Sequence, residues 1–353
     1  MTLPPIRADL GLGDGYHSPQ VEAAVRLNTN ESPFPPPAAW VEAVRDEIAH
    51  VAWHRYPDRG AWSLRKAIGD LHGVRPEQVW AANGSNEVLQ TLLLAYGGVG
   101  RTVAVWEPTY ALHRHIAELT GTAVVAGGRG PDLALDRSEV ERVIKAGQPT
   151  VTFLCSPNNP TGEAADPDLV ADVVARAPGL VVVDEAYGQF APWSAAGLVA
   201  DDAPVVVTRT YSKTWSLAGL RLGYCLAPAE VVAAMERAAL PYHLDAFTQL
   251  AGRLALRFVD DMELRVSKLV EQRGRVAGAL CDLPVEAWRS DANFILFRPR
   301  ARRGTDVWRG LLDRSVLIRD CSTWPGLDDC LRVTIGTPAE NDAFLAALTE
   351  VLA

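Results

Sequence analysis

The stretch Leu180–Tyr187 reads LVVVDEAY, and it decides the fold class of this chain. Four apolar residues without a polar interruption are typical of a strand buried on both faces of a sheet. Similar runs occur at Thr102–Trp106, Thr122–Ala126, Val151–Cys155, Pro204–Thr208 and Leu222–Ala227. Because helix-like segments lie between several of these runs, the sequence predicts a doubly wound α/β fold with a mainly parallel central sheet and flanking helices.

The last third of the chain has a different pattern. From about Pro228, longer amphipathic helices are expected over Phe247–Phe258 and Met262–Cys281, and strand-like runs follow at Phe294–Phe297 and Leu331–Ile335. This change indicates a second, smaller α+β domain. The proline-rich start of the chain is expected to lie across other elements. We therefore predict an N-terminal arm associated with the small domain at 1–37, a large domain at 38–240 and a small C-terminal domain at 241–353.

Composition disfavours several classes of protein. The formal net charge of -9 argues against a nucleic-acid surface, because binding to phosphates depends on clustered Lys and Arg. The chain lacks an apolar run near the roughly 18 residues of a membrane span and the basic start of a signal peptide. Its five cysteines form no C-x-x-C pair, which suits reduced thiols. We expect a cytoplasmic protein with small-molecule ligands, no membrane or nucleic-acid partner and no metal site.

Lysine is scarce, which narrows the search for a reactive amine. The chain has four lysines, at Lys66, Lys145, Lys213 and Lys268. Lys213 stands close to Thr210, Ser212 and Arg221, and hydroxyls and a guanidinium near a helix start can hold a phosphate. The amine would then be free to form an imine with a carbonyl. Considered alone, Lys213 would more often be a solvated surface lysine.

Two further segments suggest parts of a cofactor site. Asp184 ends an apolar strand, where a carboxylate needs a cationic partner such as a protonated pyridine nitrogen; the alternative is a helix cap. The segment Asn83–Glu87, NGSNE, precedes a predicted helix and could bind phosphate, although a plain helix cap would have the same sequence. Taken together, the amine, the carboxylate and the phosphate cradle match pyridoxal phosphate.

Four motifs in this order resemble the class I/II aminotransferases, which are pyridoxal-phosphate enzymes of fold type I. They are SPNNPTG from Ser156, DEAY from Asp184, TYSK from Thr210 and LAGLRLGY from Leu217. Within that superfamily the chain resembles the histidinol-phosphate aminotransferases most closely. The segments that carry this resemblance are Arg26–Pro37, His54–Gly60, Ala81–Gln90, Glu107–His113, Leu240–Leu244, Ser290–Phe297, Leu317–Asp320 and Leu331–Thr337.

The resemblance implies a site for pyridoxal 5'-phosphate. Lys213 would carry the cofactor and move the proton on the substrate carbon, Asp184 would hold the pyridine nitrogen, and Tyr110 would stack on the ring. The other implied cofactor contacts are Ser85, Asn86, Asn159, Tyr187, Thr210, Ser212, Arg221 and, from the second subunit, Tyr56. This last contact implies a homodimer with shared active sites.

The same resemblance implies two acidic substrates. Arg332 would bind the α-carboxylate of glutamate, with Asn30 near it, and Arg319 would bind the phosphate of histidinol phosphate. Tyr16 and Tyr242 would lie near that phosphate. The implied reaction is transamination between histidinol phosphate and 2-oxoglutarate in histidine biosynthesis.

Three alternatives remain open at the level of sequence. An aromatic-amino-acid aminotransferase would share the core, and Trp215, where a smaller aromatic is usual, keeps it open. A decarboxylase of phosphorylated amino acids shares the subfamily, and a pyridoxal-phosphate-binding regulatory module would need an additional DNA-binding region. Ser32 and the GYHSPQ segment around Tyr16 also depart from the usual pattern, which concerns the substrate and not the cofactor.

Overall fold

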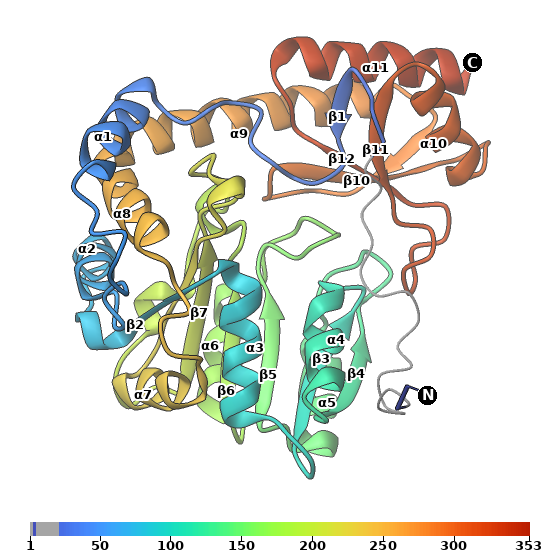
Figure 1. Ribbon diagram of the computed structural model, residues 1–353. Helices are drawn as coiled ribbons and strands as arrows, with labels where there is room; N and C mark the ends of the chain where they lie inside the picture. The colour runs from blue at the N-terminus through green and yellow to red at the C-terminus, as the bar shows by residue number, and fades with distance from the viewer. Residues whose placement is uncertain (1–2, 5–20) are drawn as a thin grey trace.

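A seven-stranded sheet forms the centre of the larger part of the computed structural model, which describes residues 3–4 and 21–353 (Figure 1). The strand order is β2-β8-β7-β6-β5-β3-β4. Strand β8 runs antiparallel to both of its neighbours, whereas the other pairings are parallel. The strands are β2 (Val79–Ala82), β3 (Thr102–Glu107), β4 (Ala123–Gly128), β5 (Val151–Cys155), β6 (Leu180–Asp184), β7 (Val205–Thr210) and β8 (Gly223–Leu226).

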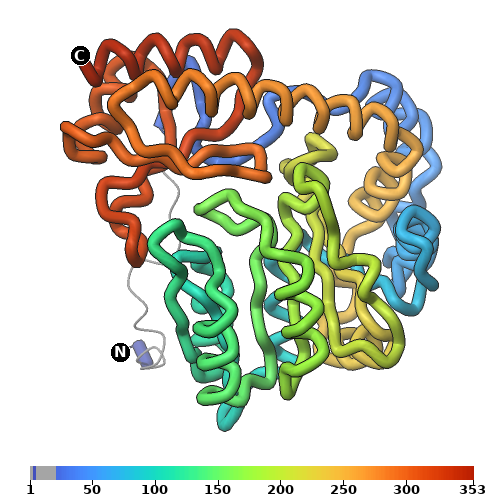
Figure 2. The backbone as a smooth tube through the Cα atoms, turned by 180° about the vertical axis from the view of Figure 1, so that it is seen from behind, coloured from blue at the N-terminus to red at the C-terminus, as the bar shows by residue number. Residues whose placement is uncertain are grey.

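Helices cover both faces of this sheet, which explains the uninterrupted apolar runs. On β6, Val181 and Val183 belong to the core on one face, whereas Val182 belongs to the core on the other. Seen from behind in Figure 2, the sheet again lies between helical layers. The first face is covered by α2 (Trp62–His72), α5 (Arg137–Gly147), α6 (Pro167–Arg176) and the end of α8 (Ala246–Ala255), and the second by α3 (Gly84–Tyr96), α4 (Ala111–Leu119) and α7 (Ala229–Ala238).

A five-stranded sheet in the order β1-β11-β12-β10-β9 forms the smaller part. Strand β1 (Val25–Leu27) comes from the N-terminal region and pairs in parallel with β11 (Val316–Asp320). The chain thus places its first described strand beside one of its last. The other elements are β9 (Val285–Ala287), β10 (Phe294–Pro299), β12 (Leu331–Thr334), α9 (Val259–Cys281), α10 (Gly304–Asp313) and α11 (Pro338–Leu352).

The strand order reverses between β3 and β5, and this decides where a ligand can bind. From β3 the chain places β4 on one side, whereas β5, β6 and β7 follow on the other. Crevices at the carboxyl ends of strands beside such a reversal are the usual ligand sites of α/β sheets. The loops after β3, β5 and β7 lead to Tyr110, Asn159 and Lys213, and β6 ends at Asp184.

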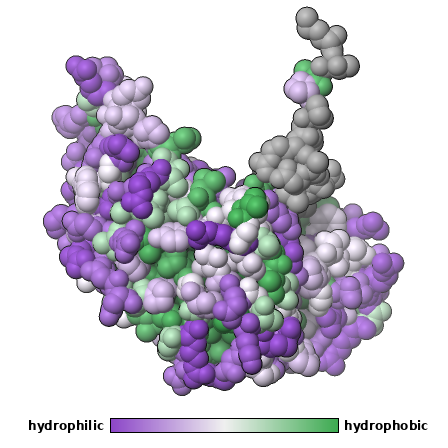
Figure 3. Space-filling model, turned by 90° about the horizontal axis from the view of Figure 1, so that it is seen from below, coloured by the Kyte–Doolittle hydropathy of each residue, from purple (hydrophilic) through white to green (hydrophobic). Residues whose placement is uncertain are grey.

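The predicted fold class is confirmed, and the structure adds elements that the sequence did not reveal. Strands β5 and β6 have the predicted bounds, whereas β1 and β2 were not predicted. Among the described residues, none of the helices combines the length and the apolar character that crossing a bilayer requires. Viewed from below, much of the outer rim of the molecule is hydrophilic, with smaller apolar areas between (Figure 3).

Candidate active site

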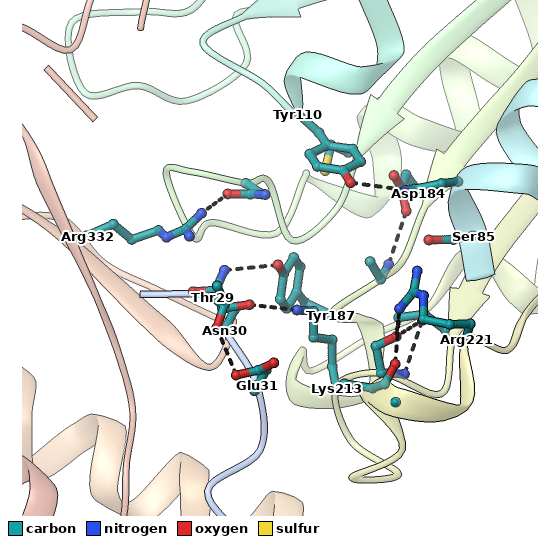
Figure 4. Close-up of a pocket in the computed structure, with 18 residues that line it drawn as sticks. Thr29, Asn30, Glu31, Ser85, Tyr110, Asp184, Tyr187, Lys213, Arg221 and Arg332 are labelled. Carbon is teal, nitrogen blue, oxygen red and sulfur yellow. Dashed lines mark hydrogen bonds between the residues drawn. The ribbon is translucent and has the colours of Figure 1, made fainter. Parts of the chain in front are cut away.

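A cavity of about 360 Å³ lies where the carboxyl ends of the large-sheet strands face the small sheet. Most of the residues predicted to bind cofactor or substrate line it (Figure 4). They are Asn30, Ser85, Asn86, Tyr110, Asn159, Asp184, Tyr187, Thr210, Ser212, Lys213, Arg221 and Arg332. The structure therefore brings together side chains that are up to about 300 residues apart in the sequence.

Lys213 is the only lysine among the residues that line this cavity. Its Nζ donates a hydrogen bond to the backbone oxygen of Thr29 at 2.9 Å and lies 5.8 Å from the centre of the Tyr187 ring. Burial and, to a smaller extent, the nearby Arg332 lower the pKa of the Lys213 amine to about 7, whereas Glu31 opposes this shift. A substantial fraction of the amine is therefore uncharged near neutral pH, as imine formation requires.

Asp184 is held by three donors at the end of β6. Its Oδ1 accepts hydrogen bonds from the Ala186 backbone N–H at 3.2 Å and from the Thr208 hydroxyl at 3.0 Å. Its Oδ2 lies 3.0 Å from Nε2 of His113, a buried histidine on α4 that stacks on Phe153. These donors satisfy both oxygens of a buried carboxyl group. His113 is a site residue that the sequence analysis missed, although it lies one turn after Tyr110.

A phosphate-sized cradle lies at the start of α3, beside Ser212 and Arg221. Arg221 donates to the Ser212 hydroxyl at 3.2 Å, and Thr210 donates to the same hydroxyl at 3.0 Å. Gly84 has a φ of +81°, and a Cβ there would lie 2.7 Å from the Arg221 guanidinium. The glycine thus allows the guanidinium to lie against the N-terminus of α3. The guanidinium, the helix N-terminus and hydroxyls, including that of Ser85, could together bind an anion.

Three polar pairs lie around the centre of the cavity. The Tyr110 hydroxyl donates to Oδ1 of Asn86 at 3.0 Å. The Asn30 amide donates to the Tyr187 hydroxyl at 2.9 Å. Arg332 hydrogen-bonds to Asn159, which joins the small sheet to the loop after β5. These contacts fix the amide and phenol groups that are expected to surround the cofactor ring.

Arg332 extends from the middle of β12 into the cavity. Its second terminal nitrogen donates to the Asn28 backbone oxygen at 3.1 Å, and its guanidinium lies 5.0 Å from the centre of the Phe294 ring. Its Nε has no hydrogen-bond partner in the described part of the chain. A buried donor of this kind suits a carboxylate ligand.

The remaining predicted residues lie elsewhere or outside the described residues. Tyr56 and Tyr242 stack on each other with ring centres 4.5 Å apart, and their side chains are exposed. Arg319 is buried beside the Trp324 ring and is not among the residues that line the cavity. Tyr16 lies outside the described residues.

Several lining residues were not predicted. Thr29 and Glu31 flank Asn30, and the short β1 strand that positions them gave little signal in the sequence. Cys155, Ala186, Ala218 and Gly219 also line the cavity. Trp215, which had kept an aromatic substrate open, is buried in the core against Tyr211 and does not line the cavity.

Comparison with known proteins identifies the family. Residues 22–348 match the family model described as aminotransferase class I and II. The chain belongs to this family. It is 44% identical to a histidinol-phosphate aminotransferase of Frankia casuarinae, over 99% of this chain and 90% of the relative. It is 43% identical to one of a Mycobacterium species, over 97% of this chain and 93% of the relative.

A solved structure supports the same fold. The histidinol-phosphate aminotransferase of Sinorhizobium meliloti, in complex with pyridoxal-5'-phosphate, superposes with a TM-score of 0.85 and is 23% identical. The superposition covers 94% of this chain and 91% of that one. The family membership confirms the predicted enzyme class, an aminotransferase, and its cofactor, pyridoxal phosphate. The donor set of Lys213, Asp184 and the cradle at Arg221 fits this cofactor.

Proposed function

We propose that this aminotransferase moves an amino group between histidinol phosphate and 2-oxoglutarate in histidine biosynthesis. The observation that carries the proposal is a pair of buried arginines. Arg319 on β11 lies directly opposite Arg332 on β12. Directly opposite residues of antiparallel strands point to the same face of the sheet, so both arginine side chains start from neighbouring positions on one face. Buried neighbouring cations favour anionic ligands, and the proposed substrates offer a carboxylate and a phosphate.

The comparisons support the choice of substrate. The relatives that are 41–44% identical over nearly the whole chain carry the name histidinol-phosphate aminotransferase. The burial of Trp215 removes the feature that favoured an aromatic substrate. A carboxylate-binding Arg332 also suits transamination with glutamate better than loss of carbon dioxide.

The protein's own residues would perform distinct steps. When bound, pyridoxal phosphate supplies a reactive carbonyl and an electron-withdrawing ring. We assign to Lys213 the covalent attachment of the cofactor and the movement of a proton at the substrate carbon, since it is the only lysine among the described residues that line the cavity. Asp184 would hold a positive charge on the ring nitrogen, and His113 would orient Asp184. Tyr110, Asn159 and Tyr187 would keep the ring in place.

We also propose a cytoplasmic homodimer with shared active sites. Tyr56 and Tyr242 stack on each other, and other large side chains close to them in sequence are also exposed, which favours a covered surface in the assembled protein. The exposed side chains are Trp53, Tyr56, Trp62, Leu240 and Tyr242. In the dimer, Tyr56 would contact the cofactor phosphate of the other subunit. The five cysteines are all free thiols, as suits a reducing compartment.

A direct assay tests the substrate. The purified enzyme should be mixed with glutamate and either imidazole-acetol phosphate or phenylpyruvate, and the two specificity constants compared. The proposal predicts a preference of at least about a hundredfold for the phosphorylated substrate, because phenylpyruvate has a carboxylate for Arg332 but no phosphate for Arg319, which would stay buried without an anionic partner. Equal constants, or a preference for phenylpyruvate, would favour an aromatic aminotransferase.

A further inference from the structure

The positively charged side chains that line the cavity each have an assigned ligand, whereas one of the negatively charged side chains does not. Lys213, Arg221 and Arg332 each match a carbonyl or an anionic part of the cofactor or substrates. Two carboxylates line the same cavity, and one of them, Asp184, is buried and bound by donors of the protein. The other, Glu31, has no role in binding the cofactor or an acidic substrate.

The backbone holds Glu31 at the edge of the cavity. The preceding residue, Asn30, is buried with a left-handed φ of 57°, and its backbone N–H donates to Thr334 at 3.0 Å. The Asn30 amide also donates to Tyr187, so the turn is fixed from both sheets. The Glu31 carboxylate accepts a hydrogen bond from the Thr29 hydroxyl at 2.8 Å (Figure 4). Glu31 is nevertheless exposed to solvent.

Glu31 also lies close to the reacting centre. The amine of Lys213 donates to the backbone oxygen of Thr29, two residues before Glu31. The Glu31 carboxylate opposes the effect of burial on the pKa of Lys213, as a nearby negative charge does. A substrate whose amine is bound near Lys213 would therefore have its side chain within reach of residues 29–31.

We propose that Glu31 is a specificity-determining residue that accepts a hydrogen bond from the imidazole ring of the amino substrate. The inference rests on the proposed function and deepens it. An imidazole always carries an N–H, and it can also carry a positive charge, so it pairs well with a carboxylate. A phenyl ring offers neither, and the side-chain carboxylate of glutamate is repelled. One negative group would thus favour the imidazole substrate over both competitors.

The test uses the holoenzyme and three amines in single-turnover reactions. They are histidinol phosphate, the phosphate ester of phenylalaninol, and glutamate, each followed by the change in cofactor absorbance. Glu31→Gln should lower the specificity constant for histidinol phosphate about five- to tenfold, the range for loss of one charge-assisted hydrogen bond at a partly solvated site. The constants for the phenyl ester and for glutamate should stay the same or rise. Glu31→Ala should repeat this pattern.

The control variant is Glu42→Gln, which makes the same charge change at an exposed position on helix α1 (Ala38–Ile48) and should alter none of the constants. An equal loss with all three amines would show that Glu31 only supports the turn, and no loss with histidinol phosphate would exclude the contact. Either result overturns the inference. If the unmodified enzyme does not react with histidinol phosphate at all, the proposed function itself fails, and this arm identifies that case separately.

Discussion

The active site has one side formed by the large sheet and another formed by the small sheet. The two sides differ in how far apart in the sequence their residues are. On the large-sheet side, Asp184, Ser212 and Arg221 come from loops and strand ends within 40 residues of one another. On the small-sheet side, Asn30 bonds to Thr334, which is 304 residues away. The first side would bind the cofactor, which both half-reactions share. The second would bind substrates, which differ, so variants on the two sides should have different selectivity.

Lys213 should give the largest effect, because it would act on every substrate. Lys213→Ala should lower turnover by at least about a thousandfold with both glutamate and histidinol phosphate, since no other amine lines the cavity. The visible absorbance of the covalently held cofactor should disappear as well. Lys66→Ala is the control, because Lys66 forms an exposed ion pair with Asp70. Borohydride labelling of a lysine other than Lys213 would contradict the assignment.

Asp184 should give the next largest effect and again affect both half-reactions equally. Asp184→Asn should lower the turnover number about 100- to 1000-fold, because a neutral amide stabilises a charged ring nitrogen poorly. Thermal unfolding should show that the variant is folded, since the side chains have nearly the same shape. Near-normal turnover, or a loss confined to one substrate, would contradict the assignment of the large-sheet side to the shared cofactor.

Substitutions of the two paired arginines should each affect one substrate more than the other. Arg332→Ala should lower the specificity constant for glutamate about 10- to 100-fold, the value of a buried charge-assisted contact. Arg319→Ala should lower that for histidinol phosphate by a similar factor and affect glutamate less. Single-turnover measurements of each half-reaction would check both. An equal loss on both substrates from Arg319→Ala would mean that Arg319 supports Arg332 and does not bind the phosphate.

The pH dependence of cofactor uptake should test whether the pKa of the Lys213 amine is lowered. Its pKa is lowered to about 7, so the reactive uncharged amine increases as pH rises through 7. The rate at which the apoenzyme regains its absorbance should therefore rise about tenfold between pH 6 and 8 and level off above. Stopped-flow mixing with pyridoxal phosphate at constant ionic strength would measure this. A midpoint near pH 10 would mean that the amine is solvated in the free enzyme.

The contrast between the two sides also explains what the sequence could predict. Buried parallel strands have a strong apolar signal, and polar residues directly after them converge at one sheet edge, so Asp184 and Lys213 were predictable. Strand β1 has three residues, too few for a pattern, and its pairing with β11 joins distant parts of the chain. Thr29 and Glu31 were missed for this reason. The position of Trp215 in the core likewise depends on packing, which a single sequence does not reveal.

Substitution of His113 should have the smallest effect. It tests whether the cofactor-binding residues on the large-sheet side depend on a buried neighbour that contacts Asp184. The ring is buried and parallel to Phe153 at 4.6 Å, with Nε2 at 3.0 Å from Asp184. Its Nδ1 has no hydrogen-bond partner in the described part of the chain, so a proton there would be buried without an acceptor. The contact at Nε2 and the unpartnered Nδ1 fit a ring that donates from Nε2 to Asp184.

His113→Phe keeps the stacking and removes this donor, while Thr208 and Ala186 still bond to Asp184. We expect turnover with both substrates to fall about three- to tenfold at unchanged KM, because the carboxylate is less well oriented but still charged. The absorbance of the bound cofactor should shift with it, a readout that a purely structural role would not move. A loss as large as that of Asp184→Asn would mean that His113 keeps Asp184 charged and does not merely orient it.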